Sequence, residues 1–169
     1  YFAEECEYDA AGNLIAAITD GINHLYAYDD LAQLSLENSP NHTLSYGHDS
    51  LYNRVQKNGK PHQINDLNEL LSLEGTSCSY SLNGNQLLKQ TPSEIFRFTY
   101  DPLNQLIEAI SEKHKISFSY DVLDRRLSKI VYTPTFYGWK EISHELYLYH
   151  GQNEIGAFTP DNQPKNLRI

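Results

Sequence analysis

The sequence predicts an all-β fold built from stacked antiparallel β-hairpins. Three observations predict it: a Tyr-Asp pair recurs along the chain, turn-forming residues follow each pair, and apolar and polar residues alternate before it. Alternation with a period of two is typical of a strand that has one covered face. A short motif that recurs at a regular interval is typical of repeat architectures.

The repeat is counted from the residue that opens each unit, which we call position zero. Successive units lie 20, 20, 16, 16, 20, 20 and 29 residues apart, and the last interval contains an insertion over residues 133–144. The middle units are degenerate, because histidine and isoleucine replace the tyrosine. Eight units make up one hairpin array over residues 1–169, and they begin at Tyr8, Tyr28, His48, Ile64, Tyr80, Tyr100, Tyr120 and Tyr149.

The residue after position zero is predicted to start a tight turn. Its side-chain oxygen can accept a hydrogen bond from the backbone two residues further on. Seven units carry a suitable residue here: Asp9, Asp29, Asp49, Asn65, Ser81, Asp101 and Asp121. The fourth residue after position zero often tolerates a positive φ, as at Gly12, Asn68, Gly84, Asn104 and Asp124. This pattern predicts a hairpin loop that ends in a β-bulge.

Each turn is expected to lie between two apolar strands. We expect the side chains two residues before position zero to form a buried ladder with the tyrosines. They are Cys6, Tyr26, Tyr46, His62, Cys78, Phe98, Phe118 and Tyr147. An apolar residue six or seven positions after position zero is expected to close each hairpin, as Leu14, Leu34, Val55, Leu70, Leu87, Leu106, Leu127 and Ile155.

Two segments need separate interpretation. Residues 65–74 could be read as an amphipathic helix, but their place in the repeat favours a hairpin. Residues 161–169 follow a turn at 159–162 and are predicted to form one more strand. Nothing in the sequence closes the edge of such a sheet, and the chain contains no methionine, so we expect an internal piece of a longer repeat protein.

Charge and composition exclude several classes of function. The net charge is −9 and the 13 basic residues are dispersed, which argues against a nucleic-acid surface. The chain has no apolar run of about 18 residues that could span a membrane, and its first residues show no signal peptide. Cys6 and Cys78 lie four units apart, on the order of 20–40 Å in a stack of strands. A disulfide needs Cα atoms within about 7 Å, so two free thiols are expected.

The motifs from Tyr8 to Leu14 and from Tyr100 to Leu106 resemble those of the RHS/YD-repeat family, and the segment from Tyr120 to Arg126 resembles a variant of them. The resemblance covers about residues 8–158. It implies an open, curved sheet that is part of a hollow shell, with neighbouring repeats and a C-terminal cargo domain of the same polypeptide as partners. It also implies a secreted or cell-surface location. The family's self-cleavage segment has no counterpart in this sequence.

Turn formation explains the repeated aspartates better than chemistry does. Equivalent aspartates on neighbouring hairpins would lie roughly 10 Å apart, whereas calcium ligands lie at about 2.4 Å from the ion. None of the seven histidines has the spacing of a metal or catalytic pair, although His144 and His150 lie near the tryptophan loop. His48 and His62 are interpreted as substitutes for core aromatics. We therefore predict no catalytic, cofactor-binding or metal-binding residue.

Two functions of different classes follow. The leading hypothesis is a structural segment of a repeat shell that encloses or presents a toxin or other cargo, with no enzymatic activity. The alternative is a cell-surface binding module that recognises carbohydrate or a surface protein. Tyr137 and Trp139, in the insertion, are the candidate ligand contacts because their surroundings suggest an exposed loop tip. The other aromatic residues are assigned to the covered face of the sheet.

Overall fold

The computed structural model describes residues 4–167, and this part of the chain consists of strands and connecting loops. Seventeen strands and no helix lie between these residues, which confirms the all-β prediction. The chain divides into two compact units, residues 1–75 and residues 76–169. Among the described residues there is accordingly no helix that could cross a membrane.

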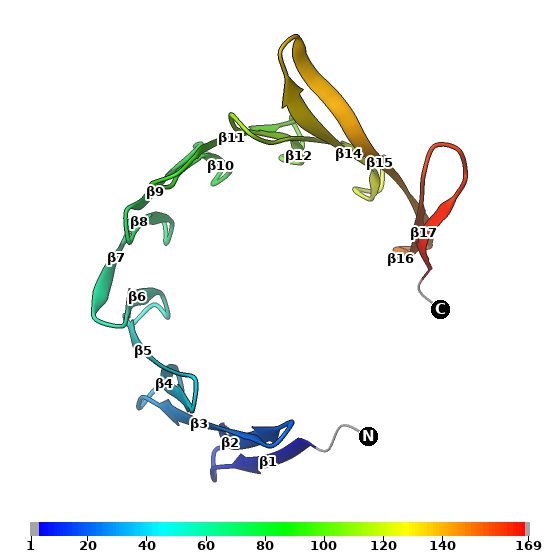
Figure 1. The fold of residues 1–169 in the computed structure, drawn as a ribbon. Helices are drawn as coiled ribbons and strands as arrows, with labels where there is room; N and C mark the ends of the chain where they lie inside the picture. Colours follow the sequence, from blue (N-terminus) through cyan, green and yellow to red (C-terminus); the bar gives the residue numbers. More distant parts are fainter. Residues whose placement is uncertain (1–3, 168–169) are drawn as a thin grey trace. The chain divides into compact units, whose positions relative to one another are not determined.

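The first unit is a meander in which each strand pairs antiparallel with the next one (Figure 1). Its strands are β1 (Glu4–Tyr8), β2 (Leu14–Thr19), β3 (Ile22–Tyr28), β4 (Leu34–Ser39), β5 (His42–His48), β6 (Arg54–Lys57), β7 (Lys60–Ile64) and β8 (Leu70–Leu73). The segment at residues 65–74 is a loop and a strand, so the hairpin interpretation is confirmed.

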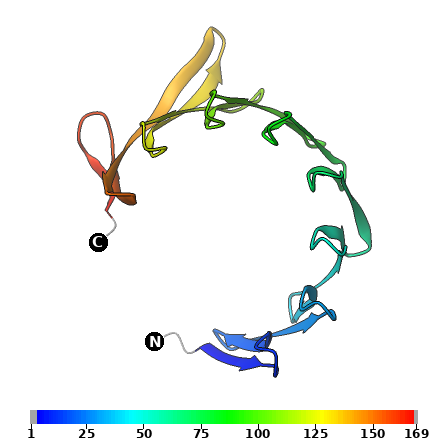
Figure 2. The same cartoon turned by 180° about the vertical axis from the view of Figure 1, so that it is seen from behind.

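The second unit follows the same plan. Its strands are β9 (Thr76–Tyr80), β10 (Gln86–Gln90), β11 (Ile95–Tyr100), β12 (Leu106–Ile110), β13 (Lys115–Tyr120), β14 (Arg126–Thr135), β15 (Gly138–His150), β16 (Asn153–Phe158) and β17 (Pro164–Leu167). The insertion lengthens β14 and β15 into a hairpin that projects beyond the neighbouring strands (Figure 2). β17 is the additional strand that the tail predicted, although residues 168 and 169 lie outside the described part.

The loops that begin at position zero have the expected backbone. All five residues predicted to take a positive φ do so, among them Gly12 at 88° and Asn104 at 64°. Two further loops place Ala32 at φ 58° and Tyr52 at φ 65° in the same position. Alanine and tyrosine adopt this conformation at a cost in energy, because the Cβ atom crowds the backbone. The loop geometry therefore overrides the preference of these two residues.

The residue that closes each hairpin lies six positions after position zero in every loop of this kind. In three units the prediction was off by one, because Arg54, Gln86 and Arg126 pair with the opening residue. Val55, Leu87 and Leu127 come one residue later, at a shift in the register that marks a β-bulge. The bulge places a polar residue opposite position zero, whereas the apolar pattern had pointed to the residue that follows it. Leu87 and Leu127 are 42% and 41% exposed.

The last unit differs from the other seven. Tyr149 is followed by a two-residue turn, with His150 opposite Asn153 and Gly151 at φ 61°. The expected closing residue Ile155 is therefore not the partner of Tyr149, which lies opposite Glu154. A loop of the repeated kind appears instead between β16 and β17, where Asn162 takes a φ of 61°.

The sheet is one layer thick in each unit, and the expected buried ladder is only half-buried. Among the described residues the buried apolar side chains are Ala17 and Ala157, and no large side chain is fully buried. Phe98 and Tyr100 are half-buried, whereas Tyr8 is 61% exposed and Cys6 is exposed. One face is nevertheless better covered than the other, as the alternation in β9 and β11 shows. Both cysteines are free thiols, as predicted.

Candidate functional site

The aspartates of the Tyr-Asp pairs hold the loops together. In the loop after β11, Asp101 Oδ1 accepts hydrogen bonds from the backbone N–H groups of Leu103 and Gln105, both at 2.9 Å. The same two bonds are made by Asp9, Asp29, Asp49, Asn65 and Asp121, and at a longer 3.2 Å by Ser81. This confirms that the repeated aspartates form the turns.

Hydrogen bonds from neighbouring side chains also favour the ionised form of several of these carboxylates. The Asn13 side chain donates to Asp9 and lowers the pKa of its carboxyl group, and Arg125 does the same for the pKa of Asp121. A carboxylate that accepts several N–H bonds is stabilised in its ionised form. It is therefore a poor proton donor near neutral pH.

The tyrosines at position zero have a role that the sequence did not reveal. The Tyr28 hydroxyl donates to the carbonyl oxygen of Leu14 at 2.8 Å, and the Tyr120 hydroxyl donates to that of Leu106 at 2.9 Å. Each carbonyl belongs to the closing residue of the preceding hairpin, beside its bulge. Each hydroxyl therefore ties the opening residue of one hairpin to the closing residue of the hairpin before it, where the bulge disturbs the ladder.

His62 provides the same bond in a degenerate unit. Ile64 stands at position zero and has no hydroxyl group to donate. His62, two residues earlier, contacts the carbonyl oxygen of Arg54 through Nδ1 at 2.9 Å. It is 8% exposed, which confirms its interpretation as a core substitute. His48, at position zero of the preceding unit, is half-buried.

Within each unit, polar side chains link neighbouring hairpin loops at one end of the strands. The residue five after position zero reaches the next loop: Asn53 donates to Asn68 at 2.8 Å, and Asn85 donates to Asn104 at 2.7 Å. The pattern continues with Gln105, which donates to Asp124 at 2.7 Å. These bonds tie neighbouring loops to each other.

A cluster of charges and rings lies on the half-buried face of the second unit. The Arg126 guanidinium stands 4.4 Å from the centre of the Tyr147 ring and 5.9 Å from that of Phe118. The Tyr147 hydroxyl donates to Glu145 at 2.9 Å. Burial and the neighbouring Glu145 raise the pKa of Tyr147 to about 12. Lys165 also contacts Glu145, at 3.1 Å, so the cluster links β14, β15 and β17.

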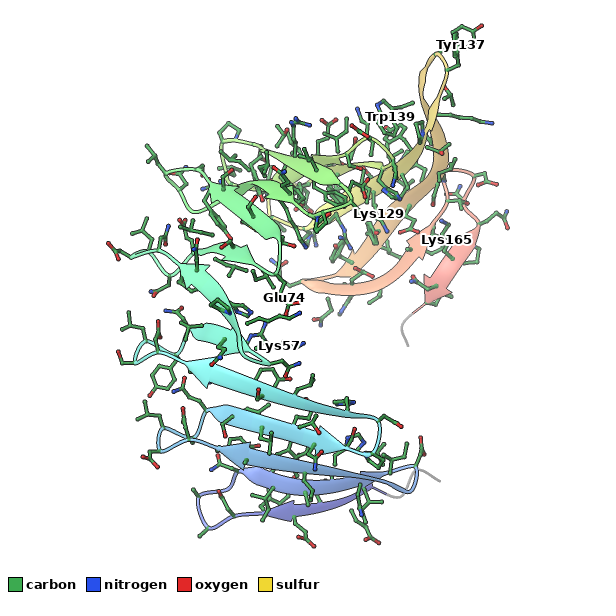
Figure 3. All side chains as sticks on the ribbon, turned by 60° about the vertical axis from the view of Figure 1, so that its left-hand side comes forward. Lys57, Glu74, Lys129, Tyr137, Trp139 and Lys165 are labelled. Carbon is green, nitrogen blue, oxygen red and sulfur yellow. The ribbon has the colours of Figure 1, made fainter. Side chains whose placement is uncertain are left out.

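The projecting hairpin carries the most exposed aromatic residues. Phe136 and Tyr137 form its two-residue tip, with 94% and 95% of their surfaces exposed. Their rings meet edge to face, with centres 5.1 Å apart. Figure 3 shows Tyr137 at the end of the hairpin and Trp139 further down. The structure therefore places Tyr137 at a loop tip, as expected.

Trp139 lies elsewhere than the sequence suggested. It sits on β15 opposite Pro134 and is half-buried. The second tip residue is Phe136, which was not among the predicted ligand contacts. The signal that could have found it is Gly138, whose φ of 123° ends the tight turn directly after Phe136 and Tyr137.

Two clusters of serine, histidine and glutamate were not foreseen. Ser39 Oγ lies 3.1 Å from His42 Nδ1, and His42 Nε2 lies 3.0 Å from Glu37. This is the contact order of a nucleophile, a base and an orienting acid. Ser39 is 9% exposed at the start of the β4–β5 turn, and its hydroxyl also donates to the carbonyl oxygen of His42 at 3.4 Å. The cluster links the two strands of the hairpin.

The second cluster has a different order of contacts. Glu94 accepts a hydrogen bond from Ser111 at 2.5 Å and contacts His114 Nδ1 at 3.2 Å. The carboxylate thus lies between the other two groups, so histidine cannot take a proton from serine. Both clusters share a Ser-x-x-His spacing around a turn, and this is the sequence signal that could have found them.

The remaining histidines do not converge on a metal. His144 lies 3.5 Å from Glu141, and His150 is exposed at the turn after β15. Within residues 4–167 no three His, Cys, Asp or Glu side chains are grouped as metal ligands.

Comparisons with known proteins concern the fold alone. No protein-family model and no curated protein matches the sequence. Similar solved structures include a Tc holotoxin pore of Photorhabdus luminescens, with 14% identity and a TM-score of 0.43. They also include a TcdB2–TccC3 complex with Cdc42, with 16% identity and a TM-score of 0.45, and a TcdB2–TccC3 complex without the hypervariable C-terminal region, with 14% identity and a TM-score of 0.45.

These matches cover 96% of this chain and 9% of the other chain. Values of identity and TM-score this low carry no argument about function. The resemblance to the RHS/YD-repeat family rests on the motifs and loops of this chain itself.

Proposed function

We propose that this chain is a segment of a protein wall in which repeated hairpins enclose or present a cargo. The observation that carries the proposal is the single-layered sheet, whose buried apolar side chains within residues 4–167 are Ala17 and Ala157 alone. Aromatic side chains such as Phe98 and Tyr100 lie half-buried on one face. Covering them would stabilise an assembly by roughly 25 cal/mol for each Å² of apolar surface removed from water.

The repeat contacts support the same role. The loops are linked by side-chain hydrogen bonds, and a tyrosine hydroxyl donates to the closing residue of the hairpin before it. These contacts join neighbouring hairpins within a unit, as in other repeat proteins, and so favour a continuous sheet there. By the family resemblance, the cargo is a C-terminal domain of the same polypeptide, and the assembly is secreted or lies at the cell surface.

Low-resolution imaging of the full-length polypeptide tests the wall role. We expect a hollow particle whose interior holds the cargo domain. A compact, solid particle would contradict the proposal. The thiol of Cys78 gives a second readout, because it is half-buried on β9 in the chain alone. Its reaction with a maleimide should be slower in the full-length assembly than in the chain of 169 residues.

A surface-binding module is the second candidate, and the exposed tip of the β14–β15 hairpin favours it. Paired aromatic rings that lie almost entirely in solvent offer faces for a sugar or for a protein surface. A glycan array tests this role with the intact chain, with Trp139→Ala and with Tyr137→Ala. Leu82→Ala is the matched control, since Leu82 is fully exposed on the loop after β9. Absence of binding by the intact chain would leave the wall role alone.

A further inference from the structure

The outer half of β15 has one unpaired edge. Residues 138–145 pair with β14, from Thr135 opposite Gly138 to Lys129 opposite Glu145. β16 pairs with β15 only from Leu146 to His150. Within the described residues 4–167 no strand therefore covers the other side of residues 138–145. An uncovered strand edge presents N–H and C=O groups to which another strand can be added.

The chain itself keeps this edge open. β16 ends at Phe158, and the loop that follows turns the chain away, closed by bonds from Thr159 N–H to the Gln163 carbonyl and from Asn162 N–H to the Thr159 carbonyl. Pro160 in this loop has no N–H group that could pair with β15. The next strand, β17, then pairs with the far side of β16.

A depression of about 360 Å³ lies beside the open edge. Residues 141–144 of β15 form one wall, and Thr159, Pro160, Asp161 and Lys165 form the other. Ile142 is 60% exposed there. Figures 1 and 3 show the projecting hairpin beside β16 and β17, with Trp139 on the hairpin and Lys165 on β17. The depression adjoins the unpaired backbone, so an added strand would have side-chain contacts as well as main-chain bonds.

The depression carries a net negative charge once its internal ion pairs are counted. The Lys165 ammonium group donates to Ser143 at 2.7 Å and pairs with Glu145 at 3.1 Å, so its charge is already compensated. Glu141 and Asp161 remain, with His144 lying 3.5 Å from Glu141. A hydrogen bond from the Thr159 side chain lowers the pKa of Asp161 and keeps it ionised at neutral pH.

We propose that the open edge of β15 binds an extended peptide with a basic side chain by β-strand addition. The peptide backbone pairs with residues 138–145, an apolar side chain lies against Ile142, and a lysine or arginine lies between Glu141 and Asp161. The proposal is independent of the wall role, and it differs from glycan binding at the hairpin tip because it uses the backbone of the strand edge.

The single tryptophan of the chain provides a local signal, since Trp139 lies on the open edge. The probe is an acetylated and amidated Val-Lys-Val-Lys-Val peptide, added to the intact chain while Trp139 fluorescence is followed. We expect saturable binding, and about tenfold weaker binding of the Val-Glu-Val-Glu-Val peptide at low salt. A version of the lysine peptide methylated at alternate backbone nitrogens keeps its charge but cannot pair, and should not bind.

Variants of the chain test whether the two carboxylates determine the affinity for the peptide. The double variant Glu141→Gln with Asp161→Asn should bind the lysine peptide only as weakly as the intact chain binds the glutamate peptide. Lys113→Gln is the control, because Lys113 lies on the exposed turn between β12 and β13. The proposal would be overturned if the methylated peptide bound as tightly as the unmethylated lysine peptide. It would also be overturned if the lysine and glutamate peptides bound equally tightly. Binding detected by calorimetry without any change at Trp139 would overturn it as well, because it would place the peptide on another edge.

Discussion

The hydroxyl group of Tyr120 donates a hydrogen bond to the backbone carbonyl of Leu106, fourteen residues earlier, at 2.9 Å. The two residues belong to successive hairpins, and Leu106 closes the first of them opposite Tyr100. The bond explains why tyrosine and not phenylalanine opens the unit. An aromatic ring could pack in either case, but only the hydroxyl can donate this bond.

Tyr120→Phe should therefore destabilise the chain while leaving the ring in place. We expect the free energy of unfolding to fall by about 1 kcal/mol, because a part-buried carbonyl loses its partner. Urea denaturation followed by circular dichroism measures it. Tyr137→Phe is the control, since Tyr137 is 95% exposed at the hairpin tip. Equal stability of the two variants would contradict this role of the hydroxyl.

Asp101→Ala should open the loop after β11. The change removes the acceptor for two backbone N–H groups and should cost about 1–2 kcal/mol in the free energy of unfolding. Asp101→Asn keeps the oxygen and should be nearly neutral, because Asn65 makes the same two bonds in its own loop. If the asparagine variant lost as much stability as the alanine variant, the charge and not the hydrogen bonds would hold the turn.

Ala32→Gly should stabilise the chain, since Ala32 has a φ of 58°. Glycine adopts this conformation without a Cβ clash, and we expect a gain of about 0.5–1 kcal/mol in the free energy of unfolding. Gly12 already occupies the equivalent place in the first loop. Ala11→Gly is the matched control, because Ala11 has no positive φ, and this change should bring no gain. Thermal denaturation distinguishes the two variants.

Tyr147 should ionise at unusually high pH. Burial and Glu145 raise its pKa to about 12, from the ordinary value of 10.0. Because the folded state holds the proton more tightly, the stabilisation is complete below pH 10 and is lost as the pH rises through about 12. Ultraviolet titration of tyrosinate should lose its step near pH 12 in Tyr147→Phe. An unchanged titration curve in that pH range would show that another tyrosine gives the step.

Local features of the fold could be predicted because they depend on neighbours in the sequence. Asp101 forms its turn with residues two and four positions away, and Asn104 takes a positive φ within the same loop. The predictions failed where the outcome depended on strand register. Val55 and Leu87 fit the apolar pattern, but a bulge placed Arg54 and Gln86 opposite position zero. The ladder predicted as buried is half-buried, because no second layer within residues 4–167 covers it.

The sequence by itself determined the all-β class, the position of the seven repeated turns that follow residues 8 to 120, and the part that the aspartates play, since turn preferences act over a few residues. Only the tertiary structure decided what the tyrosines and the insertion do. The bond from Tyr120 to Leu106 and the open edge beside Trp139 both depend on which strands become neighbours and where their pairing stops. Pairing between strands is set by contacts distant in sequence, and a pattern of residues along one strand does not specify where a neighbouring strand ends.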